Sequence, residues 1–231
     1  MKVAIHQPNF LPWIGYFHKI SLVDSFVLLD DVQLERGKTY TQRAKILIEG
    51  NEKWITIPVI NKSDLTLIKD AQVDPLFIWK RKILKTIELN YNNSPGFEDV
   101  FNIIQKAFMT DSKFLIDYNI PLIIEFSRYI GLNAKFILSS ELEKSAQKTG
   151  KEKFLEINKT LQADVYVSGT GQGSMRYIEE EDYLKNGIEL QWQKFAFKEY
   201  PQLKSKSFVK GLSIIDLVFN CAKNSIKSIY T

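Results

Sequence analysis

Short apolar runs alternate with longer amphipathic stretches along the first thirty residues of the chain. Residues 2–6 and 25–29 are apolar runs of strand length, and residues 12–22 between them have the length and apolar content of a helix. A strand, a helix and a second strand in this order form a crossover that joins parallel strands. The carboxyl ends of both strands then lie at one edge of a sheet, where the ligands of open α/β sheets bind.

The same pattern returns towards the C-terminus. Residues 134–138 and 164–167 are typical of strands, and the helix between them begins at Thr149-Gly150-Lys151-Glu152, which has the form of a capping box. Residues 188–192 alternate between apolar and polar side chains, as in a further strand. The pattern predicts an α/β fold with a mostly parallel sheet and flanking helices.

Two other sections lie outside these crossovers. Residues 45–48 and 54–59 have the pattern of a hairpin, and residues 76–131 carry apolar stripes with helical spacing. A last short helix is expected to be capped by Ser213. Because no repeat or low-complexity tract divides the chain, we expect residues 1–231 to form a single α/β domain with a mainly helical insertion over residues 76–131.

Composition narrows the class of protein. Of 231 residues, 45% are hydrophobic and 25% are charged, as in an ordinary globular protein. A single cysteine excludes an intrachain disulfide, and one cysteine with two histidines does not make a structural zinc site, so no metal is expected. A net charge of +4 from scattered cations suits an anionic substrate and is too small for a nucleic-acid-binding surface. Since no long apolar segment occurs, we expect no membrane insertion and a cytoplasmic location.

The stretch from His6 to Lys19 is the most unusual in the sequence. Pro8 and Pro12 force a defined turn between strand and helix, and His6 and Gln7 stand at the strand end. This arrangement is typical of a phosphate or nucleotide pocket in which His6 acts as a base or donor. The alternative is a rigid corner whose histidine and glutamine only satisfy backbone groups.

Asp30 and Asp31 follow the second strand, so we expect them beside His6. Adjacent carboxylates accept hydrogen bonds from ligand hydroxyls, or hold a divalent ion where a third acidic ligand is near, which the neighbouring sequence lacks. Turn formation is the alternative. His6, Asp30 and Asp31 are therefore the candidate catalytic residues.

The segment that follows Asp31 alternates cations with an aromatic ring. Its members are Lys38, Tyr40, Arg43 and Lys45. Such a segment suits a diphosphate beside a stacked base or sugar, and the planar guanidinium of Arg43 suits phosphate in particular. A solvated basic loop is the alternative.

A glycine-rich loop follows the strand over residues 164–167. Its sequence is Ser168-Gly169-Thr170-Gly171-Gln172-Gly173-Ser174, without the Lys-Ser/Thr of a P-loop or the spacing G-x-G-x-x-G. We interpret it as a candidate anion-binding nest at the same edge as His6.

Several segments spread along the chain match the sequence motifs of a known protein family. They are residues 6–17, 24–33, 54–59, 139–142, 166–169, 200–202 and 212–220, together with Arg43. Taken together they resemble the WbqC-like family of bacterial proteins. The resemblance covers nearly the whole chain, and its first segment, from His6 to Phe17, is long and specific. The chain departs from the family pattern at Gln172 and Ala222.

The resemblance implies a role in the biosynthesis of bacterial surface polysaccharides such as O-antigen and capsule. Some members of the family are described as glycine transferases that act on an amino sugar. Carried over by position, the polar motif residues of the family are His6, Gln7, Asn9, Tyr16, Asp30, Asp31, Gln33, Arg43, Ser168, Gly169, Tyr200, Gln202 and Asp216. Trp13, Gly171 and Gly173 complete the set of candidate substrate-binding residues.

We therefore hypothesise a transferase that acylates or aminoacylates the amine of a nucleotide-linked amino sugar, with an acyl or amino-acid donor as the second partner. His6, Asp30 and Asp31 would supply the base, and backbone amides of residues 169–173 would bind the oxyanion. The sequence indicates no particular cofactor.

Two alternatives remain open. One is a nucleotidyl transferase or adenylating enzyme, in which His6 and His18 hold phosphates. The other is a glycan-assembly binding module that performs no catalysis and binds sugars on aromatic rings. Those rings would be Trp13, Tyr16, Trp54 and Tyr200.

Overall fold

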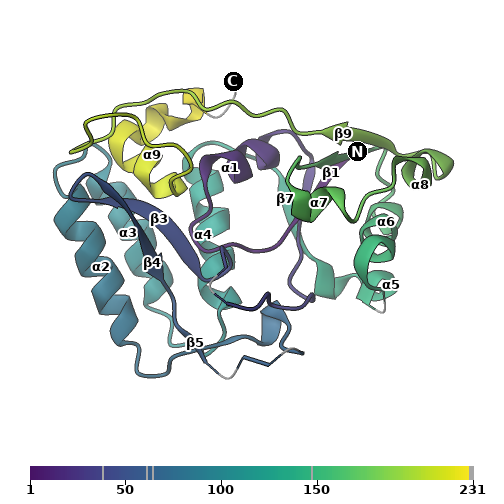
Figure 1. The fold of residues 1–231 in the computed structure, drawn as a ribbon, viewed down its shortest axis with the longest axis horizontal. Helices are drawn as coiled ribbons and strands as arrows, with labels where there is room; N and C mark the ends of the chain where they lie inside the picture. The colour runs from purple at the N-terminus through teal and green to yellow at the C-terminus, as the bar shows by residue number, and fades with distance from the viewer. Residues whose placement is uncertain (38, 61, 64, 147, 229–231) are drawn as a thin grey trace.

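A five-stranded parallel sheet organises the computed structural model, which describes residues 1–37, 39–60, 62–63, 65–146 and 148–228 (Figure 1). Its strands are β1 (Lys2–His6), β2 (Ser25–Leu28), β7 (Lys135–Leu138), β8 (Val165–Ser168) and β9 (Glu189–Trp192). They lie in the order β7-β2-β1-β8-β9, and every neighbouring pair is parallel. The predicted α/β class and parallel sheet are confirmed.

Helices connect these strands. They are α1 (Ile14–Ser21) between β1 and β2, α5 (Glu143–Ala146) and α6 (Gly150–Thr160) between β7 and β8, and α7 (Gln172–Met175) and α8 (Glu180–Lys185) between β8 and β9. The turn η2 (Ser139–Glu141) follows β7, and α9 (Ile214–Cys221) and η3 (Ala222–Ser228) follow β9. Numbered by their order along the chain, the five strands are arranged 3-2-1-4-5, which is a doubly wound topology.

Side chains of the sheet alternate between two apolar cores, as the two-residue period of a strand requires. Ala4 and Val167 point into the larger core, to which α1 and α9 also contribute. Val3 and Tyr166 point to the opposite face, where they pack against side chains of α6 and α8. Because both faces are covered, polar side chains of the sheet collect at the strand ends.

The region after β2 is antiparallel. β3 (Arg43–Ile48) pairs with β4 (Asn51–Thr56), and β5 (Val59–Ile60) pairs with β6 (Gln72–Val73), with the turn η1 (Ile68–Asp70) before β6. The predicted hairpin is confirmed, but the single strand expected over residues 54–59 is wrong at its end. Pro58 separates β4 from β5, because proline has no N–H for a ladder.

Three helices lie between β6 and β7 in the chain: α2 (Ile78–Tyr91), α3 (Phe97–Phe108) and α4 (Ile116–Tyr129). In Figure 1, α2, α3 and the β3–β4 hairpin occupy the left of the molecule, and α5, α6 and α8 occupy the right. The stripe formed by Trp79, Ile83 and Ile87 is buried in the core, as its spacing predicted.

The two predicted helix caps have different outcomes. Ser213 caps α9, with its Oγ accepting a hydrogen bond from the N–H of Ile215 at 3.4 Å. Thr149 precedes α6 but makes no side-chain capping bond, so the predicted box does not form. The carboxylate of Glu152, its other member, lies 3.8 Å from Nζ of Lys148 instead.

Candidate functional site

The change of direction in the strand order brings His6 next to Gly169. The chain runs from β1 towards β2 but from β8 towards β9, so the topological switch point, where open α/β sheets have their ligand crevice, lies between the carboxyl ends of β1 and β8. The pairing of β1 with β8 runs to Ala4 opposite Val167, so His6 and Gly169, each two residues further on, lie at the same edge of the sheet. The expectation that the two β-α-β units share one sheet edge is confirmed.

The imidazole of His6 is held in one tautomer. Its Nδ1 lies 3.1 Å from the carbonyl oxygen of Gln7, which only accepts, so Nδ1 carries the proton and Nε2 has the lone pair. The Tyr16 hydroxyl donates to the same carbonyl at 3.1 Å. Burial, aided by the charge of Lys19, lowers the pKa of His6 to about 3. The ring is therefore neutral at physiological pH.

Lys19 reaches the same crevice from the last turn of α1. Its Nζ lies 3.6 Å from the point where a Cβ on Gly169 would stand, and the hydroxyl of Ser174 lies 3.6 Å from that point. Burial lowers the pKa of Lys19 to about 7. A neutral imidazole, an amine and a hydroxyl thus border one crevice.

Gln193, directly after β9, holds α1 against the sheet. Its Nε2 donates to the carbonyl of Gly15 at 2.7 Å and lies 2.9 Å from Nδ1 of His18. Because an amide NH2 group only donates, Nδ1 of His18 is the acceptor. The remaining oxygen, Oε1, lies 4.0 Å from the Cβ point of Gly169. Gln193 therefore adds an acceptor to the crevice.

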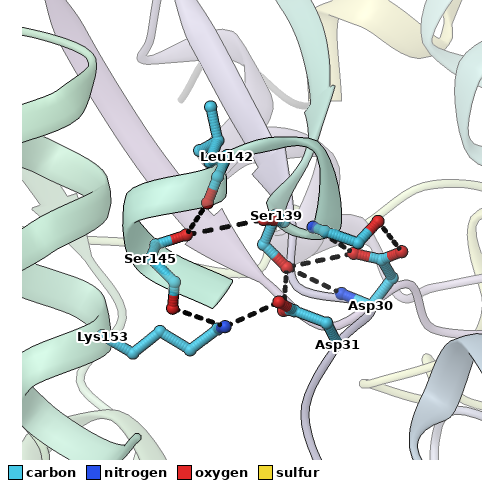
Figure 2. Close-up of polar contacts among 7 residues, drawn as sticks. Asp30, Asp31, Ser139, Leu142, Ser145 and Lys153 are labelled. Carbon is cyan, nitrogen blue, oxygen red and sulfur yellow. Dashed lines mark hydrogen bonds and ion pairs between the residues drawn. The ribbon is translucent and has the colours of Figure 1, made fainter. Parts of the chain in front are cut away.

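The Asp30 carboxylate is directed to the end of β7 (Figure 2). Its Oδ1 accepts hydrogen bonds from the Ser139 hydroxyl and the Ser140 N–H, each at 3.0 Å, and its Oδ2 accepts from the Ser140 hydroxyl at 2.7 Å. The side chain is almost completely buried, with 1% of the residue exposed. Its polar contacts join β2 to β7, and a catalytic role for Asp30 stays a prediction.

Asp31 belongs to an ion pair on the same side of the sheet (Figure 2). Its Oδ2 lies 2.7 Å from Nζ of Lys153 on α6, and its Oδ1 accepts from the Ser139 hydroxyl. Lys153 also donates to the carbonyl of Ser145 at 3.0 Å. The carboxylate is thus paired, and its proposed catalytic role also stays a prediction.

A separate depression lies between the β1–α1 loop, the start of β3 and the segment before α9. Asn9, Trp13 and Arg43 are among its lining residues. The guanidinium of Arg43 stacks on the ring of Trp54 at 4.0 Å, and its buried Nε has no hydrogen-bond partner among the described residues. Three predicted substrate-binding residues are therefore brought together here, away from the crevice.

Tyr200 and Gln202 contact a buried carboxylate. Oδ2 of Asp216 accepts from the Tyr200 hydroxyl at 2.8 Å and from Nε2 of Gln202 at 3.2 Å, and its Oδ1 accepts from the Tyr91 hydroxyl at 2.8 Å. Burial raises the pKa of Asp216, although these bonds oppose the shift. The network connects α2, α9 and the segment between β9 and α9.

The other predicted residues are dispersed. Gln33 is exposed and forms a bridge with Leu67, and Gly171 is exposed in the loop before α7, which contains Gly173. Ser168 is buried at the end of β8. Lys45 pairs with Glu52 at 2.7 Å, and Lys38 lies outside the described residues. Within the described ranges, no three His, Cys, Asp or Glu side chains converge as a metal site would require.

Lys19 and Gln193 are the site residues that the sequence pattern did not single out. Residues 14–20 of α1 are all buried, so this short helix has no solvent-facing side for a lysine. This burial results from packing by distant segments, so no local sequence signal could have identified Lys19. The sequence around Gln193 gives no signal either, because only the pairing of β8 with β9 brings this residue to Gly169.

The fold and the crevice define a doubly wound α/β protein with a polar site at its topological switch point. The chain belongs to the WbqC-like protein family, whose model matches residues 7–228. It is 28% identical over 222 residues to "Uncharacterized protein Rv1507c" of Mycobacterium tuberculosis, a match that covers 95% of this chain and 93% of that protein. No solved structure matches the chain.

The family suggests a role in polysaccharide biosynthesis. Among the helices of the described residues, none has both the length and the apolar character needed to cross a membrane.

Proposed function

We propose that this protein is a transferase that acylates or aminoacylates the amine of a nucleotide-linked amino sugar, for example with glycine. The observation that carries the proposal is the neutral imidazole of His6, fixed in one tautomer at the switch point of a parallel sheet. Switch points of such sheets bind nucleotides, and amine acylation needs a proton acceptor beside the bound substrate.

The reaction assigns one role to His6. The sugar amine attacks the acyl carbon, a new C–N bond forms, and the amine proton passes to Nε2 of His6. The bond between the acyl carbon and its leaving group then breaks, and the leaving group takes the electron pair and the proton from Nε2. A bound anion beside Lys19 offsets the lysine charge and raises the pKa of His6, since a nearby opposite charge favours the imidazolium.

A mass-spectrometric screen tests the proposal. Nucleotide-linked amino sugars are incubated with glycine and ATP, or with acyl or aminoacyl donors, and a product with the mass of the acylated sugar is expected. His6→Ala should abolish the product while thermal unfolding changes little, because His6 is the last residue of β1 and is only partly buried. Full activity of this variant, or no acylated product from any pair, contradicts the proposal.

The same crevice favours a second candidate, nucleotidyl transfer, because its order of strands is that of nucleotide-binding sheets. In that reaction His6 and His18 would both hold phosphates. Nδ1 of His18 is already bonded to Gln193, so His18→Asn is the discriminating variant. Release of diphosphate from a nucleoside triphosphate, lost in both His6→Ala and His18→Asn, would favour nucleotidyl transfer.

A further inference from the structure

The buried lysines of the described residues differ in whether another group of the protein pairs with them. They are Lys19, Lys80 and Lys153, with 3%, 9% and 2% of their surface exposed. Lys153 pairs with Asp31 at 2.7 Å, and Lys80 contacts Asp111 at 3.3 Å and the carbonyl of Thr110. Lys19 has no such ion pair or hydrogen bond within the described part of the chain. Of these three lysines, Lys19 is the one that has no anionic side chain of the described residues as a partner.

An unpaired buried cation is unfavourable for folding. Removing an ammonium from water is costly, and a partner of opposite charge normally offsets that cost. Here burial lowers the pKa of Lys19 to about 7, so the folded protein lessens the cost by releasing the proton. An anion that enters from outside the chain removes the same cost, because it restores the missing partner.

The groups around Lys19 suit an anion. Gly169 has no side chain, and the point where its Cβ would stand is 3.6 Å from Nζ of Lys19 and 3.6 Å from Oγ of Ser174. Because Gly169 has no Cβ, a ligand can approach its backbone closely, as phosphates do at glycine turns of parallel sheets. The two surrounding donors, an ammonium and a hydroxyl, both suit an oxyanion.

Gln193 adds a constraint on the ligand. Its Oε1, an acceptor, lies 4.0 Å from the same point, and the contacts of Nε2 with Gly15 and His18 fix this orientation of the amide. A hydrogen-bond donor on the ligand would pair with this oxygen. A ligand that uses all of these groups has an O–H or N–H close to its oxyanion, as a sugar phosphate or a nucleotide does, and as an amino acid does with its ammonium group.

We propose that Lys19, Ser174 and the backbone of Gly169 bind a phosphate oxyanion, and that Oε1 of Gln193 accepts a hydrogen bond from an adjacent hydroxyl of the same ligand. Phosphate is favoured over the carboxylate of an amino acid because the site lies at the switch point between β1 and β8. That the phosphate is part of a nucleotide-linked sugar rests on the function proposed above, whereas phosphate binding itself does not.

The test measures binding without turnover. UDP, inorganic pyrophosphate and glycine are titrated by calorimetry into the wild-type protein, Lys19→Met and Lys80→Met. Lys19→Met removes the charge at nearly constant shape, and should weaken UDP and pyrophosphate binding about tenfold or more, the scale of a lost charge-assisted hydrogen bond. Its unfolding temperature should stay the same or rise, because an unpaired buried charge is removed.

Lys80→Met is the matched control. It removes a buried lysine that has protein partners, so its unfolding temperature should fall while its affinity for UDP and pyrophosphate is unchanged. Wild-type protein that binds neither UDP nor pyrophosphate overturns the proposal, as does unchanged affinity in Lys19→Met. A loss confined to glycine overturns the phosphate assignment in favour of a carboxylate. If phosphate binding depends on Lys19 but no acylated sugar is formed, only the function proposed above fails.

Discussion

Two neighbouring residues, His6 and Lys19, have pKa values well below the ordinary values of their side chains. The pKa of His6 falls from 6.5 to about 3 and that of Lys19 from 10.5 to about 7, in both cases mainly because burial penalises the charged form. Each shift costs stability at the pH where the unfolded chain would bind the proton. Natural proteins accept such costs chiefly at functional sites, where stability is exchanged for reactivity.

The shift of Lys19 predicts how stability varies with pH. Between pH 7 and pH 9 the unfolded chain keeps this proton and the folded chain has largely lost it, so the free energy of unfolding should rise with pH. One such group contributes up to about 1.4 kcal/mol per pH unit. Urea unfolding at pH 7, 8 and 9 measures this slope, which Lys19→Met should reduce.

Other titrating groups limit the pH range in which this slope can be assigned to Lys19. His6 and His18 change charge below pH 6.5, and above pH 9 the raised pKa of Cys221 acts in the opposite sense. Burial also lowers the pKa of Lys62, so a smaller slope remains in the variant. Equal slopes in the wild-type protein and in Lys19→Met would show that Lys19 is not buried as described.

Sequence reasoning identified His6 and not Lys19, for a physical reason. His6 stands at the junction of an apolar strand with a proline-bounded turn, and both features are local in the sequence. Whether a helical lysine is buried depends on what packs around it. Gly169, 150 residues further along the chain, lies beside Nζ of Lys19, so this environment forms only in the folded protein.

At the scale of elements, Asp30 acts as a connection between strand ends. It follows β2, and its carboxylate accepts all its hydrogen bonds from Ser139 and Ser140 after β7. β2 and β7 are separated in the chain by the hairpin and by α2 to α4, so this contact closes a long loop. Buried donors left without an acceptor cost more than the hydrogen bonds themselves contribute.

Asp30→Ala should therefore lower the free energy of unfolding by about 1 to 3 kcal/mol, as expected when a buried donor loses its partner. Urea unfolding of the variant provides the measurement. Asp24→Ala is the matched control, since Asp24 lies before the other end of β2, is exposed, and accepts from the N–H of Lys2 at 2.7 Å. Its loss should be smaller. If Asp30→Ala abolishes turnover at unchanged stability, Asp30 is catalytic and the structural interpretation is wrong.

Elements were predictable where the signal was local. Apolar runs identified the strands of the sheet, and Ser213 identified the start of α9. The hairpin strand was predicted too long, because its pattern continued past Pro58 into β5. The role of Tyr200 and Gln202 was not predictable, since their contact with Asp216 depends on how α9 packs against the preceding segment.

At the scale of the whole molecule, the order of the strands determines where a site can form. Two β-α-β units were evident from the sequence, but their relative placement was not, because each unit satisfies its local pattern alone. Pairing β1 with β8 places the end of one unit beside the end of the other. The crevice is a property of the assembled sheet and of neither unit separately.

This arrangement predicts a joint response of both units to one ligand. With UDP at saturation, amide hydrogen exchange should slow both in residues 7–21, which include α1, and in residues 168–175, because Lys19 and Ser174 would contact the same phosphate. Amides of α3 that exchange by local opening should not change, since α3 packs at the other end of the molecule (Figure 1). In Lys19→Met both responses should disappear together at the same UDP concentration. Protection of only one segment in the wild-type protein would mean that the two units do not share a ligand, because a single anion held between β1 and β8 cannot order one side of the crevice alone.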